Sequence, residues 1–187
     1  PGRLQAQQAP AGTGPASKAA AAILEVAGIE KGYCFVLDCR DGELALELVQ
    51  RTELQVVAVC ADSSTASRVR KKLDAAGAYG RAVVHVGSLT RLGYADYLAN
   101  LVVFKGVLSG RRPSKEMAGV TRLLKPGGGV AVVGASAGSD SGVRSFLTSV
   151  TEAHTRVGEL TGGVPIGGGE GAVVVSDEVT WYLTKIV

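Results

Sequence analysis

Short apolar runs alternate with amphipathic stretches along most of this chain, and the alternation predicts its secondary structure. Apolar runs bounded by turn residues are typical of parallel strands buried on both faces, and they occur at 33–38, 55–60, 82–86, 99–104 and 130–135. Stretches with apolar residues at helical spacing lie around them, at 17–29, 43–50, 63–76, 113–124 and 141–157. We expect Ser17 to cap the first of these helices and Ser63 or Ser64 to cap the third.

The C-terminal part of the chain breaks this alternation. Two strand-like runs, 172–176 and 179–187, follow a glycine-rich loop at 161–171. Only a short polar link separates the two runs, and such a link permits only an antiparallel hairpin. Strands that alternate with helices and end in a hairpin predict an α/β protein with a doubly wound, seven-stranded mixed sheet.

Composition sets limits on this architecture. The chain has 187 residues, 46% of them hydrophobic, and a net charge of +3, which suits one domain with a substantial core. The basic cluster at 68–73 has helical spacing and indicates a solvated helix face, so we expect no nucleic-acid partner. No apolar run reaches the ~20 residues that span a bilayer. We assign 1–16 to a flexible linker or processed N-terminus and 17–187 to the domain, and both ends suggest a segment of a longer protein.

The cysteines and histidines give no sign of a metal or catalytic site. Cys34, Cys39 and Cys60 lack metal-ligand spacing and lie in apolar runs, which favours small buried side chains. A Cys39–Cys60 disulfide stays open as an alternative, because neighbouring strands could bring the two together. For His85 we expect core packing and for His154 exposure, since neither has a partner at catalytic or metal spacing.

Two longer stretches carry a family resemblance. "RLLKPGGGVAVV", 122–133, and "LTRLGYADYLANLVVF", 89–104, resemble the class I S-adenosylmethionine-dependent methyltransferase fold, a Rossmann-like sheet with its last strand antiparallel. The second stretch is also similar to a methyltransferase-like domain of bacterial proteins that carry a PQQ-type β-propeller. That resemblance implies partners among flanking domains of the same polypeptide or in another protein. It also implies an exported or periplasmic location rather than a cytoplasmic one.

The family's first-strand motif is only partly present. That motif, acid-x-Gly-x-Gly-x-Gly, ends the first strand of these enzymes and places its acid on Val36. Its three glycines fall on Asp38, Arg40 and Gly42, so only the last is kept. A side chain in a left-handed conformation costs ~1–2 kcal/mol, and we expect Arg40 to reach into the path of the ligand.

The family's other two anchors have changed as well. The ribose-binding acid at the end of the second strand falls on Cys60, with Asp62 two residues later as a displaced substitute. The acid that reads adenine falls on Ser88. Each lost charged hydrogen bond removes roughly 1.5–3 kcal/mol, and two of them with the steric cost reach ~4–7 kcal/mol. Such a loss turns micromolar affinity into millimolar affinity or worse.

The leading hypothesis is therefore a degenerate, non-catalytic methyltransferase-like domain that serves as a structural or interaction module of a larger bacterial protein. It predicts no catalytic residue, no metal site and no cofactor. The alternative is an active S-adenosylmethionine-dependent methyltransferase with a divergent cofactor site. The residues of that site would be Asp38, Arg40, Gly42, Asp62 and Ser88.

Overall fold

The predicted alternation of strands and helices is present in the computed structural model, which describes residues 14–88, 93–104, 119–120, 122–135, 172–176 and 179–185. The first half of the chain contains α1 Pro15–Ala27, β1 Lys31–Leu37, α2 Glu43–Arg51, β2 Glu53–Cys60, α3 Ser63–Ala75 and β3 Ala82–Val86. The strands that follow are β4 Leu101–Phe104, β5 Val130–Ala135, β6 Ala172–Ser176 and β7 Val179–Lys185. The α/β class of the fold is thereby confirmed.

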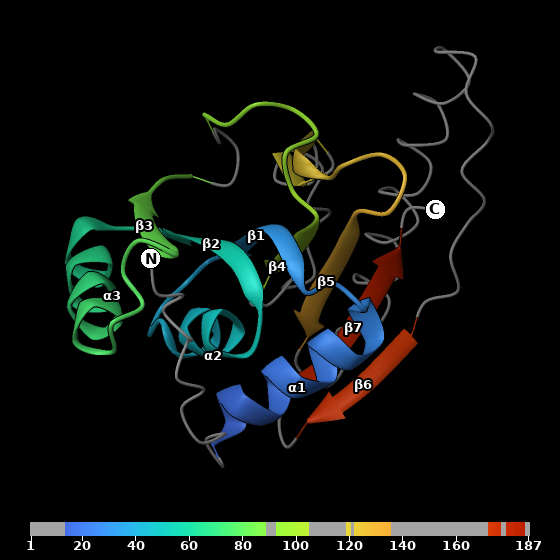
Figure 1. The fold of residues 1–187 in the computed structure, drawn as a ribbon, viewed down its shortest axis with the longest axis horizontal. Helices are drawn as coiled ribbons and strands as arrows, with labels where there is room; N and C mark the ends of the chain where they lie inside the picture. Colours follow the sequence, from blue (N-terminus) through green and yellow to red (C-terminus); the bar gives the residue numbers. More distant parts are fainter. Residues whose placement is uncertain are drawn as a thin grey trace, which may run out of the picture.

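One sheet joins these strands in the order β3-β2-β1-β4-β5-β7-β6 (Figure 1). The pairs among β1 to β5 are parallel, with Val36 opposite both Ala58 of β2 and Val103 of β4. β7 runs antiparallel to β5 on one side and to β6 on the other. The order of the strands reverses at β1, where β2 follows on one side and β4 on the other.

The helices α1, α2 and α3 cover one face of the sheet (Figure 1). Along β1, Cys34 and Val36 point into this helical layer, while Phe35 and Leu37 belong to the core of the opposite face. All four side chains are buried, which explains why the strand reads as one continuous apolar run. α1 packs against α2 and also contacts β6 and β7. The N-terminal helix therefore extends over the end of the sheet that β7 and β6 form.

The first helix begins earlier than the sequence predicts. Its N-cap is Gly14, with no side-chain cap, and Pro15 opens the helix because its missing N–H is not needed there. Ser17 therefore does not cap α1, and the prediction was wrong. The Ser17 side chain is buried and its hydroxyl accepts a 2.5 Å hydrogen bond from the Arg51 guanidinium at the end of α2. Ser17 thus links two helices.

Several predicted segments lie outside the described residues. These are the linker up to residue 13, the helix at 141–157 with His154, and the glycine-rich loop at 161–171. Of the predicted helix at 113–124, helical conformation is described at 119–120 and 122–123. Across the described ranges, no helix combines the length and apolar character that a membrane span requires.

Candidate functional site

The carboxyl ends of β1, β2 and β3 meet at one edge of the sheet, beside the point where the strand order reverses. Ligands of doubly wound proteins bind at such an edge. The turn after β1 carries Asp38, Arg40 and Gly42, and the ends of β2 and β3 lead to Asp62 and Ser88. Gly87 donates a backbone hydrogen bond of 3.0 Å to Cys60, which holds the two neighbouring strand ends together. The fold therefore brings the predicted site residues to one edge.

The turn after β1 contains a one-residue bulge at Asp38. If the β1–β2 ladder continued in register, the amide of Asp38 would donate to the carbonyl of Val59. Instead the amide of Cys39 makes that bond, at 2.8 Å. Asp38 accommodates the extra residue in a left-handed conformation, with φ 54°. Asp adopts this region more readily than most residues, so the strand end can bend here without a glycine.

Asp38 and Arg40 form an ion pair across the bulge. The Arg40 Nη2 atom lies 3.0 Å from Asp38 Oδ2, and the Arg40 side chain is 72% exposed while that of Asp38 is 24% exposed. Arg40 therefore extends along the rim of the turn with most of its side chain in solvent. Asp41 stabilises the start of α2, because its Oδ1 accepts a 3.0 Å hydrogen bond from the amide of Glu43.

Gly42 is required by the packing of the fold itself. It is the N-cap of α2, with φ 75°, a conformation that side chains rarely adopt. A Cβ atom at this position would lie 2.7 Å from the Cγ1 atom of Val69 on α3. The one glycine of the motif that the chain keeps thus allows α2 and α3 to approach each other.

Asp62 is the N-cap of α3, which corrects the predicted capping by Ser63 or Ser64. Its Oδ1 accepts hydrogen bonds from the Ser64 hydroxyl at 2.6 Å and the Thr65 amide at 2.8 Å, and its Oδ2 accepts one from the Thr65 hydroxyl at 2.8 Å. These bonds lower the pKa of Asp62 to about 2. The cap uses two hydrogen bonds on Oδ1 and one on Oδ2, so most of the acceptor capacity of Asp62 is committed to the start of α3.

Cys39 and Cys60 lie side by side under the bulge. Both are free thiols, 5% and 0% exposed, so the small buried side chains expected from the sequence are confirmed and this structure has no disulfide between them. Burial raises the pKa of Cys39 to about 12 and also raises that of Cys60. The two thiols are hydrogen-bonded to each other. Ser88 lies beyond them, exposed at the end of β3.

His85 and Tyr94 form a pair that the sequence did not reveal. His85 is exposed rather than packed in the core, so that prediction was wrong. Its Nδ1 atom lies 2.5 Å from the Tyr94 hydroxyl, and the two rings are stacked with centroids 5.7 Å apart. Tyr94 also meets Phe35 edge-to-face, at 4.8 Å between centroids. The loop before β4 brings Tyr94 to β3, and no spacing in the sequence signals that contact.

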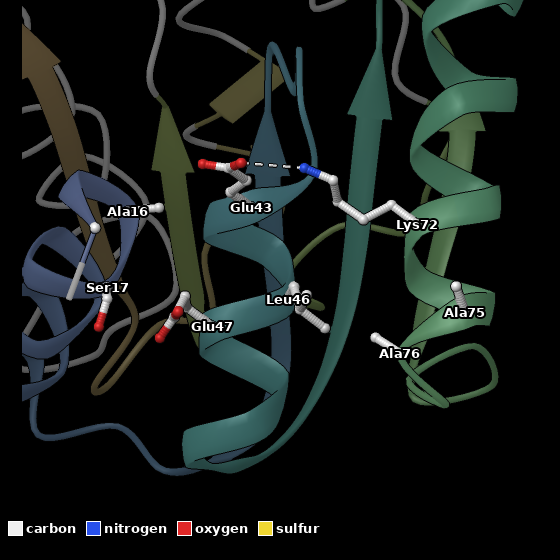
Figure 2. Close-up of a pocket in the computed structure, with 9 residues that line it drawn as sticks. Ala16, Ser17, Glu43, Leu46, Glu47, Lys72, Ala75 and Ala76 are labelled. Atoms are coloured by element: carbon white, nitrogen blue, oxygen red, sulfur yellow. Dashed lines mark hydrogen bonds and ion pairs between the residues drawn. The ribbon is translucent and has the colours of Figure 1, made fainter. Parts of the chain in front are cut away.

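A groove of about 600 Å³ lies on the outer side of α2, between α1 and α3 (Figure 2). Ala16, Leu46 and Ala75 give it a largely apolar lining. Figure 2 shows Lys72 reaching across from α3 to Glu43, and their charged atoms are 3.2 Å apart. Because this carboxylate and ammonium neutralise each other, the groove offers apolar surface rather than acid–base chemistry. Within the described residues, His, Cys, Asp and Glu side chains form no cluster of three or more that could hold a metal.

Comparisons with known proteins agree on the kind of fold. A family model described as a methyltransferase domain matches residues 37–132, which include the bulge, both thiols and Ser88. The comparison with curated protein sequences found no match.

Solved structures with a similar fold include three methyltransferases. A S-adenosylmethionine-dependent methyltransferase from Aquifex aeolicus is 14% identical with a TM-score of 0.69, over 90% of this chain and 89% of that one. A putative enzyme of the same kind from Methanococcus maripaludis is 18% identical with a TM-score of 0.65, over 91% and 83%. Magnesium protoporphyrin IX methyltransferase from Synechocystis, solved with bound S-adenosylmethionine, is 13% identical with a TM-score of 0.65, over 92% and 78%.

Proposed function

We propose, from the premise that this chain belongs to the methyltransferase domain family, that it is an S-adenosylmethionine-dependent methyltransferase with a divergent cofactor site. The cofactor supplies an activated methyl group on a sulfonium. The chain's own part is to hold the nucleoside and the amino-acid end at the carboxyl ends of β1 and β2. We specify the methyl acceptor only by its chemistry: it is a nucleophile that can reach this edge of the sheet.

The observation that carries the proposal is the backbone of the turn at 38–42. Asp38 and Gly42 stand where the family motif has its first and last glycines, and both are left-handed, with φ 54° and 75°. The chain therefore already adopts these two backbone conformations in the folded protein, so binding a ligand does not incur their cost again. The ~1–2 kcal/mol cost of a left-handed side chain at Asp38 is therefore part of the folding free energy and does not weaken ligand binding.

Asp38 is our candidate for the ribose carboxylate that Cys60 no longer supplies. The bulge places Asp38 at the strand end. Burial raises the pKa of Cys60 most, and the charges of Asp62 and then Asp38 also raise it, so both carboxylates lie near this thiol. The only carboxylate bond of Asp38 among those described is the exposed pair with Arg40. Ribose hydroxyls can replace this partner, and Arg40 is then available for the carboxylate at the amino-acid end of the cofactor. Ser88 offers a hydroxyl on the adenine side.

Asp62 is not assigned to the proposed site, because most of its acceptor capacity serves the cap of α3. Its hydrogen bonds to Ser64 and Thr65 use both carboxylate oxygens. In this proposal it positions α3 and does not bind the cofactor.

A second candidate function is the non-catalytic module. The observation that favours it is the chemistry at two anchors, where Cys60 is a buried thiol and Ser88 a hydroxyl. Neither can supply the charge-assisted hydrogen bonds of a carboxylate.

Calorimetric titration with S-adenosylhomocysteine separates the two candidates. We expect saturable binding by the wild-type chain and a loss of about 10–100-fold in affinity for Asp38→Asn, since one charged hydrogen bond is worth roughly 1.5–3 kcal/mol. Asp62→Asn is the matched control, another carboxylate at the same edge, and it should leave the affinity unchanged. Absence of binding at millimolar ligand by the folded wild-type chain would establish the non-catalytic module instead. Equal losses in both variants would refute the assignment of Asp38.

A further inference from the structure

The bulge at Asp38 changes which residue faces Cys60. In an uninterrupted ladder Asp38 would lie opposite Cys60, since Val36 lies opposite Ala58. Because the Cys39 amide donates to the Val59 carbonyl in place of the Asp38 amide, Cys39 rather than Asp38 lies opposite Cys60. Neighbouring strands are ~4.7–4.9 Å apart, and residues bridged by a disulfide have Cα atoms ~4.4–6.8 Å apart. Cys39 and Cys60 therefore stand at a separation that a disulfide can span.

The side chains of the pair point the same way. Both belong to the apolar cluster between the sheet and the helices α1–α3. Their thiols are already hydrogen-bonded to each other, so the two sulfurs start close together, and disulfide formation draws them to ~2.05 Å. Cys39 is slightly exposed, which leaves an approach for a small oxidant from the turn.

We propose that Cys39 and Cys60 are a redox-active pair that hydrogen peroxide converts to an intrachain disulfide. The thiolate of Cys60 attacks one peroxide oxygen, the O–O bond breaks, and the leaving oxygen departs as water after taking up a proton. The sulfur of Cys39 then attacks the resulting sulfenic acid, the S–O bond breaks, and a second water leaves. The two thiols are oxidised by two electrons and the peroxide is reduced. This inference does not depend on the proposed methyl transfer.

Cys60 is the better nucleophile of the pair. The hydrogen bond from Cys39 and the positive charge of Arg70 both favour its thiolate, against the effect of burial. For Cys39, burial and the charge of Cys60 raise the pKa, and a backbone hydrogen bond at Gly42 lowers it without offsetting them.

The disulfide would tie the turn after β1 to the end of β2. It would close a loop of roughly 20 residues, which includes the whole of α2, and a bond of this span restricts the unfolded chain. We expect the melting temperature of the oxidised protein to rise by roughly 5–10 °C. At the same time the turn that carries Asp38 and Arg40 would lose its freedom to adjust.

Cys34 provides an internal control within the same chain. It is as buried as Cys60, but its neighbours in the sheet are Val56 on one side and Leu101 on the other. Burial raises the pKa of its thiol well above the usual range. Peroxide should therefore leave Cys34 reduced.

The test is to treat the native, full chain with hydrogen peroxide, unfold it, alkylate the remaining thiols and map them by mass spectrometry. We expect one peptide pair joined through Cys39 and Cys60, with Cys34 alkylated and the protein monomeric. Cys34→Ala should give the same disulfide as the wild type, whereas Cys39→Ala and Cys60→Ala should give none. A disulfide that involves Cys34, a disulfide between two molecules, or thiols that stay reduced under all conditions would overturn the proposal.

The pH dependence of the reaction adds a second readout. Because only the thiolate reacts, the rate should rise about tenfold per pH unit from pH 7 to pH 9. The charged groups that act on the pair are Asp38, Asp41, Asp62 and Arg70. Carboxyl and guanidinium groups in general titrate well outside pH 7 to pH 9, so we attribute the slope to the thiols. A rate independent of pH would contradict attack by a buried thiol.

Discussion

Replacing Gly42 with alanine tests whether this glycine serves the packing of α2 against α3. The change adds one methyl group at a residue with φ 75°, 2.7 Å from the Cγ1 atom of Val69. Two costs follow from this geometry. The left-handed backbone disfavours a side chain, and the core between the helices has no room for another methyl group.

The size of each cost can be separated by comparison with Gly77. Gly77 has a similar φ of 67°, and a Cβ atom there would meet nothing within 4 Å. Gly77→Ala should therefore carry only the backbone cost, about 1–2 kcal/mol. Gly42→Ala should carry this cost and a further ~1–3 kcal/mol for forcing a methyl group into a packed core. At about 2–4 °C per kcal/mol for a domain of this size, we expect its melting temperature to lie roughly 2–12 °C below that of Gly77→Ala.

Thermal unfolding of the two variants gives the first comparison, and a double variant gives the second. Val69 is 1% exposed, so Val69→Ala is itself destabilising. However, it removes the Cγ1 atom that the added methyl group of Gly42→Ala would strike. Added to Val69→Ala, the Gly42→Ala change should cost only what Gly77→Ala costs. If Gly42→Ala costs the same in both backgrounds, or no more than Gly77→Ala, the packing argument is refuted.

Three further predictions follow from the described contacts. Asp62→Ala should lower the melting temperature at pH 7, and the difference from wild type should shrink as pH falls from 3.8 towards about 2, because the folded-state pKa is depressed and the ionised cap is stabilising only above it. Arg81→Ala should cost ~2–4 kcal/mol in urea unfolding, since its guanidinium donates to two carbonyls at the end of α2, at 2.6 and 2.8 Å. Arg70→Ala should promote concentration-dependent association in light scattering, because Arg70 donates at 2.8 Å to a carbonyl of the edge strand β3.

The buried strands were predictable because their signal is local. Phe35 and Leu37 face one core while Cys34 and Val36 face the other, so every position from 34 to 37 of β1 is apolar and the run stands out from the sequence. Helix starts were harder to place. Gly14 and Asp62 are the caps where Ser17 and Ser63 or Ser64 were predicted, each within a few residues. Several residue types can cap a helix, and the tertiary packing decides among neighbours.

The placement of the candidate site residues at one edge of the sheet was predictable, but their local geometry was not. Carrying the family motif onto the chain identified Asp38 and Arg40, and the fold brings them to the expected edge. The bulge could not be foreseen, because one inserted residue in a ladder leaves no mark on hydrophobic spacing. The same holds for His85 and Tyr94, whose 2.5 Å contact depends on how the loop before β4 folds back. Contacts between segments distant in sequence depend on the whole fold.

The fate of the motif glycines also bears on how a divergent site should be interpreted. Gly42 is the glycine this chain retains, yet its contact with Val69 gives a sufficient reason for keeping it without any ligand. Asp38 stands where the family resemblance expects a glycine, and its φ of 54° is a left-handed conformation that favours glycine. At Gly42 the residue type matches the motif but has a packing explanation. At Asp38 the residue type differs from the motif but the backbone is left-handed. For a ligand held by the backbone of a turn, the conformation is the relevant property, and under the proposed function Asp38 would also supply the carboxylate that Cys60 lacks. A change of residue type in this turn is therefore not, by itself, evidence that the site has been lost.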